Sequence, residues 1–185
     1  MPRKQPNIVV TGTPGVGKTS HCELLTSSTG LTHLSMNTIV KEKGCHEGWD
    51  EEYQSYTVDE DKLLDVLEDS YDVPTTGGYI LDWHACDIFP ESWIDLVVVL
   101  RTDSTKLYDR LKARKYSERK LQENLDSEIM EVLLQEAREG FPGEGMVVEL
   151  RSDEADEIEG NVQRITEWVS KWKEDREVQD DDDGD

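Results

Sequence analysis

One segment near the N-terminus limits the possible folds of this chain more than any other. Residues 8–20 read IVVTGTPGVGKTS, in which a β-branched run ends in a loop with three glycines and a lysine. A helical pattern follows from Lys18, and a stop signal follows at Gly30. Residues 12–19 fit the pattern GxxxxGK[ST] at every specified position. The segment therefore predicts a buried strand, a phosphate-binding loop and a helix, in that order.

The residue types of this loop suit the phosphates of a nucleotide. Glycine lets the backbone wrap round an anion, because a Cβ atom would clash with the phosphate oxygens. The next helix turns its N-terminal dipole toward the same anion. Lys18 would bridge the β- and γ-phosphates, and the Thr19 hydroxyl would bind Mg²⁺. The alternative is a plain glycine turn, but a chance match is expected in only about one chain per hundred of this length, so we favour a nucleotide site.

The rest of the chain alternates short apolar runs with helical spacing. The runs predict strands at 7–10, 31–35, 78–82, 95–100 and 146–150. The spacing predicts helices at 18–27, at 37–43, near 63–71, from about 107 to a break near Tyr116, at 121–133 and at 158–172. Residues 44–61 are acidic and aromatic, and we expect a loop there. This order predicts an α/β fold of the P-loop NTPase type, with a five-stranded parallel sheet flanked by helices.

Length and charge limit the class of protein. The chain has 185 residues, which suits one domain over about 1–176, followed by an acidic tail at 177–185 that we expect to be disordered. The formal net charge is −22, which argues against non-specific binding to nucleic acid or to anionic membranes. No run approaches the ~20 apolar residues of a membrane span. We therefore expect a protein without membrane association.

The three cysteines, Cys22, Cys45 and Cys86, are widely spaced and form no CxxC pair. This spacing predicts no disulfide framework and favours a reducing, intracellular compartment. The neighbouring pairs His21–Cys22 and Cys45–His46 would each leave a zinc site two ligands short, so we expect no zinc site.

A carboxylate at the end of a second strand often helps to hold Mg²⁺ in P-loop proteins. Asp82 directly ends the run YILD, whereas Asp103 lies three residues past its strand, so we favour Asp82. His84 follows two residues later, where it could lie near the γ-phosphate or an attacking water. The alternative for His84 is a structural hydrogen bond. Cys86 is expected to pack rather than react.

The class of P-loop enzyme follows from what surrounds these residues. The guanine-binding pattern NKxD of GTPases does not occur in the sequence. An acidic, aromatic insertion followed by an arginine-rich segment fits small phosphoryl-transfer kinases, in which catalysis is mainly positioning and charge neutralisation. Arg101, Arg110 and Arg114 are the candidate cationic clamps, and Arg114 and Tyr116 could border the adenine. A lid is the functional interpretation of this segment, and a solvated helix face is the alternative.

Five segments carry a resemblance to a known family: GTPGVGKT, DEEY at 50–53, DWHACDIFPESW at 82–93, LRTD at 100–103, and ARKY followed by KLQEN. The D-x-H-x-C-D-x-F-P-E string is far more specific than the P-loop alone. With these segments the protein resembles the atypical nuclear adenylate kinase family, and the correspondence runs from about Asn7 to Trp172, nearly the whole chain. Members of that family are also described as coilin-interacting nuclear ATPases and small-ribosomal-subunit assembly factors.

The resemblance implies a kinase core with a monophosphate-binding segment at about 35–58 and a short lid at about 113–123. It implies adenylate kinase activity with ATP, Mg²⁺ and AMP or a related monophosphate, together with intrinsic ATP hydrolysis. Catalysis would fall to Lys18, Asp82, His84 and Arg114, with Thr19 and Asp82 at the metal. The implied ATP-binding residues are Gly12, Gly15, Val16, Gly17, Lys18, Thr19, Ser20, Arg114 and Tyr116.

The resemblance also implies a basic small-subunit ribosomal protein and the pre-ribosome as partners, and a location in nucleus and cytoplasm. We expect a monomer. The chain departs from the family pattern at Thr38 and Lys41, where Asp and Arg are usual, which predicts a weaker hold on the acceptor phosphate. Lys115 stands in the lid where glycine is expected, which predicts a stiffer lid.

Three functional hypotheses remain at this point. The first is an adenylate kinase of this family. The second is a nucleotide-gated assembly factor that binds and releases a ribosomal protein, with ATP hydrolysis as its reset. The third is a kinase for another small acceptor, such as a nucleoside or a coenzyme precursor. A working monophosphate pocket around 35–58 distinguishes the first from the others.

Overall fold

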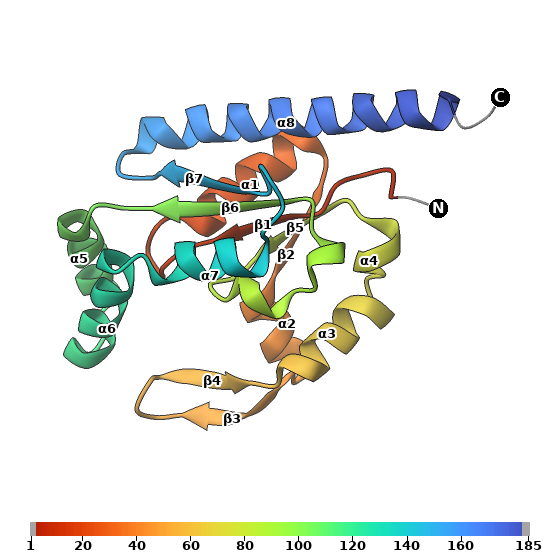
Figure 1. The fold of residues 1–185 in the computed structure, drawn as a ribbon. Coiled ribbons are helices and arrows are strands. Elements are labelled where there is room, and N and C mark those ends of the chain that lie inside the picture. The colour runs from red at the N-terminus through yellow and green to blue at the C-terminus, as the bar shows by residue number, and fades with distance from the viewer. Residues whose placement is uncertain (1–2, 183–185) are drawn as a thin grey trace.

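A five-stranded parallel sheet forms the centre of the protein (Figure 1). The computed structural model describes residues 3–182, with side chains as far as residue 177. The strands lie in the order β2 (Thr32–Ser35), β5 (Tyr79–Asp82), β1 (Ile8–Thr11), β6 (Leu96–Arg101) and β7 (Val147–Arg151). All neighbouring strands pair in parallel. The predicted α/β fold with five parallel strands is confirmed.

Helices cover both faces of the sheet (Figure 1). On one face lie α1 (Lys18–Thr29) and α8 (Ala155–Asp182), with α5 (Ser104–Ala113) and α6 (Glu118–Ile129) near the end of β6. The other face carries α2 (Met36–Lys43), α3 (Glu60–Asp69), α4 (Val73–Thr76), α7 (Val132–Gly140), and the short 3₁₀ turns Cys86–Ile88 and Glu91–Trp93. Successive residues of β1 alternate between the two cores, since Ile8 and Val10 join one and Val9 the other. This double burial explains the continuous apolar runs of the strands.

A β-hairpin occupies most of the segment that we expected to be a loop. Its strands are β3 (His46–Asp50) and β4 (Ser55–Val58), paired antiparallel. His46 stacks on Tyr56 at 4.2 Å between ring centroids, and Trp49 meets the same ring edge-on at 5.2 Å. The loop prediction was wrong because cross-strand aromatic contacts stabilise strands whose sequence is otherwise acidic.

Two predictions of local structure need correction, one of a helix and one of a disordered tail. The helix expected at 121–133 is two helices, because Glu131 adopts a left-handed backbone with φ 57° and separates α6 from α7. The disordered tail expected from residue 177 is helical as far as Asp182, since α8 continues through it. Each residue added to an existing helix gains a backbone hydrogen bond, which local composition alone does not reveal. Residues 183–185 lie outside the described part of the chain.

The predicted break near Tyr116 lies between α5 and α6. Lys115 has a left-handed backbone with φ 58° in this turn. No helix among the described residues combines the length and the apolar character needed to cross a membrane.

The strain at Lys115 can be tested by substitution with glycine. We expect Lys115→Gly to raise the free energy of unfolding by up to about 1 kcal/mol, because a left-handed backbone costs a residue with a Cβ atom about 1–2 kcal/mol and glycine's greater freedom in the unfolded chain offsets part of it. Urea unfolding measures the change. The matched control is Lys112→Gly inside α5, which should lower the same free energy by about 0.7 kcal/mol. Equal losses in both variants would contradict the assignment of strain.

Candidate nucleotide-binding site

The glycine loop between β1 and α1 has a backbone that only glycine adopts readily. Gly12, Gly15 and Gly17 have φ values of 146°, 97° and 96°. A Cβ atom on Gly12 would lie 2.7 Å from the carbonyl oxygen of Leu100, at the end of the neighbouring strand β6. The loop therefore combines a strained conformation with close packing against the sheet. Helix α1 begins directly after it at Lys18, so its N-terminal N–H groups face the space above the loop.

Lys18 lies across the mouth of this loop. Its Nζ donates to the carbonyl oxygens of Gly12 at 2.7 Å and Thr13 at 3.3 Å. Burial lowers the pKa of Lys18 to about 8, with Asp82 acting in the opposite sense and Arg114 adding to the decrease. A phosphate at this position would favour the charged ammonium.

Asp82 ends β5 beside the loop, and its carboxylate is held by two groups. Its Oδ2 accepts from Thr19 Oγ1 at 3.2 Å and lies 3.1 Å from His33 Nε2. The side chain is 7% exposed. A hydroxyl and a carboxylate this close offer the oxygen ligands that Mg²⁺ prefers, so the residues fit the metal that the resemblance implies. The rival Asp103 instead caps α5 through the N–H of Thr105 at 3.0 Å.

His84 follows Asp82 and borders the same cavity. Desolvation lowers its pKa to about 4, and the charges of Lys18 and Lys120 act in the same direction. The imidazole is therefore neutral near pH 7 and keeps one nitrogen as an acceptor. Cys86, in the next turn, is fully buried, and desolvation raises the pKa of its thiol to about 12, as expected for a packing residue.

One cavity of about 700 Å³ joins these groups. The P-loop and the start of α1 contribute Gly15, Gly17, Lys18, Thr19 and Ser20. Asp82 comes from the end of β5, and His84 from the segment that follows it. Arg114 and Tyr116 border it from the segment between α5 and α6, and their contact with ATP stays a prediction. The opposite wall comes from α2 and the hairpin and includes Asn37, Lys41, Trp49, Tyr53 and Tyr56.

Two predicted ATP-binding residues do not line this cavity. Gly12 lies at the start of the loop, directly after β1, and its carbonyl accepts from Lys18. Val16 buries its side chain in the core, and its N–H donates to the Thr13 carbonyl at 3.2 Å. Thr38, exposed on α2, is also absent from the lining, whereas Lys41 one turn later belongs to it.

Two of the three candidate arginine clamps, Arg101 and Arg110, bond to other groups of the protein and do not line the cavity. Arg110 Nη1 donates to the carbonyls of Gly15 at 3.3 Å and Ser152 at 3.0 Å. Arg101 is buried and pairs with Glu128, Nε to Oε1, at 2.7 Å. Only Arg114 of the three borders the cavity.

The turn of the hairpin touches the start of α6 at the outer side of the cavity. Glu52 pairs with Arg119, whose Nη2 also donates to Tyr53 Oη at 3.3 Å. Lys120 Nζ donates to the Gln54 carbonyl at 3.3 Å. The expected monophosphate-binding and lid segments therefore meet across the cavity.

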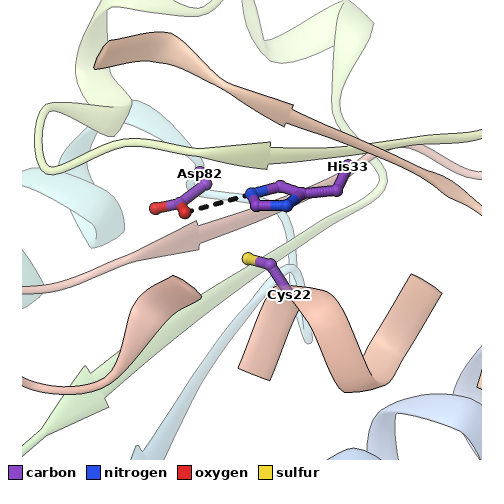
Figure 2. Close-up of side chains that lie close together, drawn as sticks. All are labelled: Cys22, His33 and Asp82. Carbon is purple, nitrogen blue, oxygen red and sulfur yellow. Dashed lines mark hydrogen bonds and ion pairs between the residues drawn. The ribbon is translucent and has the colours of Figure 1, made fainter. Parts of the chain in front are cut away.

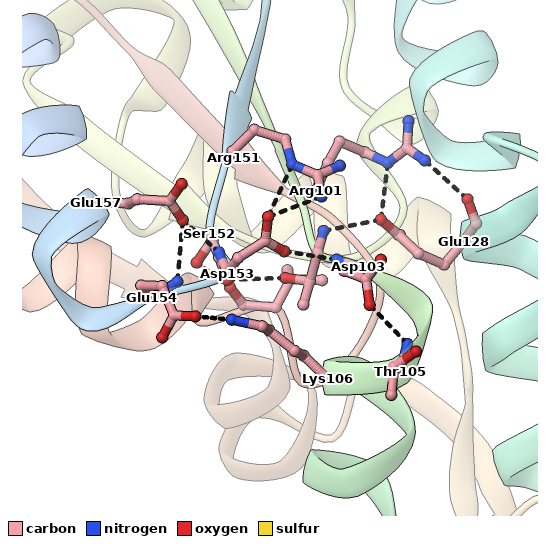
Figure 3. Close-up of polar contacts among 12 residues, drawn as sticks. Arg101, Asp103, Thr105, Lys106, Glu128, Arg151, Ser152, Asp153, Glu154 and Glu157 are labelled. Carbon is pink, nitrogen blue, oxygen red and sulfur yellow. Dashed lines mark hydrogen bonds and ion pairs between the residues drawn. The ribbon is translucent and has the colours of Figure 1, made fainter.

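Sequence reasoning missed the buried carboxylate of Glu128, which joins α6 to the P-loop. Its Oε2 accepts from Thr13 Oγ1 at 2.7 Å, and its Oε1 accepts from the Thr102 N–H at 3.0 Å and from Arg101. Figure 3 shows Glu128 beside the guanidinium of Arg101, which ends β6, with dashed lines that join the two residues. Only its helical spacing from Leu121 and Leu125, which places it on the buried face, could have indicated it.

A family model and curated relatives both match this chain. A family model described as an AAA domain matches residues 8–131. An adenylate kinase isoenzyme 6 homolog from Schizosaccharomyces pombe is 50% identical over 171 residues, covering 92% of this chain and 95% of the relative. The homolog FAP7 from Saccharomyces cerevisiae is 48% identical over 173 residues, covering 93% and 86%.

Solved structures show the same fold at low identity. Shikimate kinase from Acinetobacter baumannii, in complex with shikimate, superposes with a TM-score of 0.64 at 17% identity, covering 91% of this chain and 95% of that one. A gluconokinase from Sinorhizobium meliloti superposes with a TM-score of 0.58 at 16% identity, covering 96% and 99%. The sheet and its helices are thus those of P-loop kinases.

The contribution of Glu128 to the free energy of unfolding can be compared with that of Glu149, which contacts the same arginine. Glu128→Gln should lower the free energy of unfolding by about 3 kcal/mol, because it removes the buried carboxylate that Arg101 contacts and leaves this arginine with the more exposed carboxylates of Glu131 and Glu149. The matched control is Glu149→Gln, whose carboxylate lies 3.3 Å from Arg101 but is 37% exposed. It should cost under about 1 kcal/mol. Equal losses of unfolding free energy in the two variants, measured by denaturant unfolding, would contradict the stabilising role of the buried Glu128 carboxylate.

The protonation of His84 gives a pH-dependent test. We expect NMR titration to place its pKa below the ordinary value of 6.5, so that the ring is neutral over the whole range above pH 6. Lys120→Gln should raise this pKa, because it removes a repelling charge. Lys4→Gln, remote from the cavity, is the control and should leave it unchanged. A pKa above 6.5 in the unsubstituted protein would overturn the description of this group.

Proposed function

The chain belongs to the adenylate kinase isoenzyme 6 family, and from this premise we propose that it transfers the γ-phosphoryl group of ATP to AMP or a related nucleoside monophosphate. The observation that carries the proposal is the single cavity of about 700 Å³, which has the P-loop on one wall and α2 with the hairpin on the other. Donor and acceptor must occupy one space for direct transfer, and this space is of the size usual for ligand sites.

The donor side of the cavity supplies positive charge and fixed N–H groups. Lys18 would leave the loop carbonyls for the β- and γ-phosphates, and Arg114 would approach the same oxygens from the lid. Thr19 and Asp82 would hold Mg²⁺, which when bound offsets charge on the phosphate oxygens. A monophosphate oxygen already carries negative charge, so transfer to it needs positioning rather than a strong base.

The acceptor side offers a cation and aromatic surfaces. Lys41 faces the cavity from α2 and would bind the monophosphate as a point charge. Trp49, Tyr53 and Tyr56 border the same wall, where a base could stack on a ring face. Lysine makes fewer directed hydrogen bonds than the arginine usual in the family, so we expect a comparatively weak hold on the acceptor.

ATP hydrolysis would be the side reaction when no acceptor is bound. A water in the acceptor position would then need orientation, and His84 borders the cavity with a neutral imidazole. Such a nitrogen can accept a hydrogen bond from the water. We assign His84 this role, while Lys18 and Arg114 act in both reactions.

A second candidate function, as a nucleotide-gated assembly factor, is favoured by the acidic surface of α3. Helix α3 exposes Glu60, Asp61, Asp65, Glu68 and Asp69. With a net charge of −22, this surface suits a strongly basic partner, and we propose a small-subunit ribosomal protein within the pre-ribosome. The protein would then act as a monomer in the nucleus and cytoplasm.

The first test measures ADP formation from ATP and Mg²⁺ with and without AMP. We expect AMP to accelerate ADP formation, with two ADP formed for each ATP consumed and no free phosphate. Lys18→Ala should abolish the reaction, because phosphate binding loses its central cation. ATP cleavage to ADP and phosphate that ignores AMP would reject the kinase and favour the assembly factor.

A matched lysine pair tests the acceptor wall in the same assay. Lys41→Ala should raise the KM for AMP by at least about tenfold, the effect of losing a charged contact worth 1.5–3 kcal/mol, and leave the KM for ATP nearly unchanged. Lys43→Ala, exposed on the same helix, is the control and should change neither. Equal effects of the two substitutions would place the acceptor phosphate elsewhere.

A further inference from the structure

Three side chains from three different elements converge behind the P-loop (Figure 2). Cys22 comes from α1, His33 from β2 and Asp82 from the end of β5. Their ligand atoms all lie within 4.8 Å of one another, and His33 Nε2 is 3.1 Å from Asp82 Oδ2. Figure 2 shows the thiol directed toward the space beside the imidazole and the carboxylate. The cysteine therefore meets a histidine far from it in the sequence, and not its neighbour His21.

The three side chains of this cluster are largely shielded from solvent, as expected for a metal site inside a fold. Cys22 is fully buried, Asp82 is 7% exposed in its side chain, and His33 is 19% exposed. His21, in contrast, is held by the Gly17 carbonyl at 2.8 Å and by Asn161 at 3.2 Å, so it is not available to the cluster. Of the three side chains, Asp82 is the one that lines the cavity, together with Thr19.

We propose that Cys22, His33 and Asp82 form a binding site for a borderline divalent cation of the zinc class. A thiolate and an imidazole select Zn²⁺ over Mg²⁺, which prefers oxygen ligands alone. Three protein ligands leave a fourth position for water or for the Thr19 hydroxyl, which lies 3.2 Å from Asp82 Oδ2. Binding releases the thiol proton to solvent and forms a metal–sulfur bond.

The required adjustment is small. Metal–ligand distances of about 2.0–2.3 Å in a tetrahedral site put ligand atoms about 3.3–3.8 Å apart. The present limit of 4.8 Å thus needs a contraction of about 1 Å. His33 lies on β2, an edge strand of the sheet, and its side chain is 19% exposed.

The site has a consequence for the P-loop because Asp82 belongs to both arrangements. Zinc bound on the inner side would withdraw the carboxylate from the cavity, where we expect Mg²⁺ with ATP. The two metals would therefore compete, and zinc would act as an inhibitor. The alternative is that His33 only orients Asp82 while Cys22 packs as an apolar side chain. In that case the thiol would make no bond to a metal.

Cobalt titration of the full chain, without nucleotide, separates these possibilities. Co²⁺ replaces Zn²⁺ in such sites, and a thiolate ligand gives a near-ultraviolet sulfur-to-cobalt charge-transfer band. We expect this band with one equivalent of Co²⁺ and its loss when Zn²⁺ is added. Cys22→Ser should abolish it, and His33→Gln should weaken Co²⁺ binding by at least about tenfold. Cys45→Ser and Cys86→Ser, on the other two buried thiols, are the controls and should keep it.

Three results would overturn the proposal: no charge-transfer band in the unsubstituted chain, a band that survives Cys22→Ser, or a band lost equally in the control variants. If Cys22→Ser fails to fold, as judged by circular dichroism, His33→Gln on the edge strand decides the question alone. The readout does not depend on catalysis, so failure of the AMP assay with an intact cobalt band would reject the kinase and leave the metal site standing.

Discussion

The backbone of the P-loop is the constraint on which the rest of the structure depends. Gly12 packs so closely on the Leu100 carbonyl that no Cβ atom fits, and this contact fixes where β1 ends relative to β6. The same loop begins α1 and presents its N-terminal N–H groups to the cavity. Because β1, β6, α1 and the loop are packed together at this point, the order of the strands also positions the N–H groups that face the cavity.

Buried polar groups hold this loop from several directions. Glu128 reaches it through Thr13, Ser152 through the Val16 carbonyl at 2.6 Å, and Arg110 through the Gly15 carbonyl. Each of these groups comes from a different element of the fold. An unpaired group in such a network costs more than the bond itself contributes, so the loop is pre-organised before a nucleotide binds.

The prediction from sequence succeeded where a residue's environment follows from its neighbours in the chain. The strands could be predicted because both faces of the sheet are buried and each strand is a continuous apolar run. Lys18, Asp82 and Arg114 could be proposed as site residues from a motif, a strand end and a basic segment. All three line the cavity, and their roles stay predictions. The hairpin could not, since its stability comes from contacts such as His46 on Tyr56 across ten residues. Arg101 looked like a clamp because its buried partner Glu128 is distant in sequence.

By itself, the sequence determined the fold class, the glycine loop between β1 and α1 and the family resemblance, because those depend on local backbone preference and on short motifs. Only the tertiary structure decided which charged groups face the cavity and which bond to other groups of the protein. Arg114 and Lys41 line the cavity, whereas Arg101 and Arg110 do not. It also brought Cys22, His33 and Asp82 together from three elements. The physical reason is that the partner of a buried polar group is set by packing between elements, which spacing along the chain does not encode.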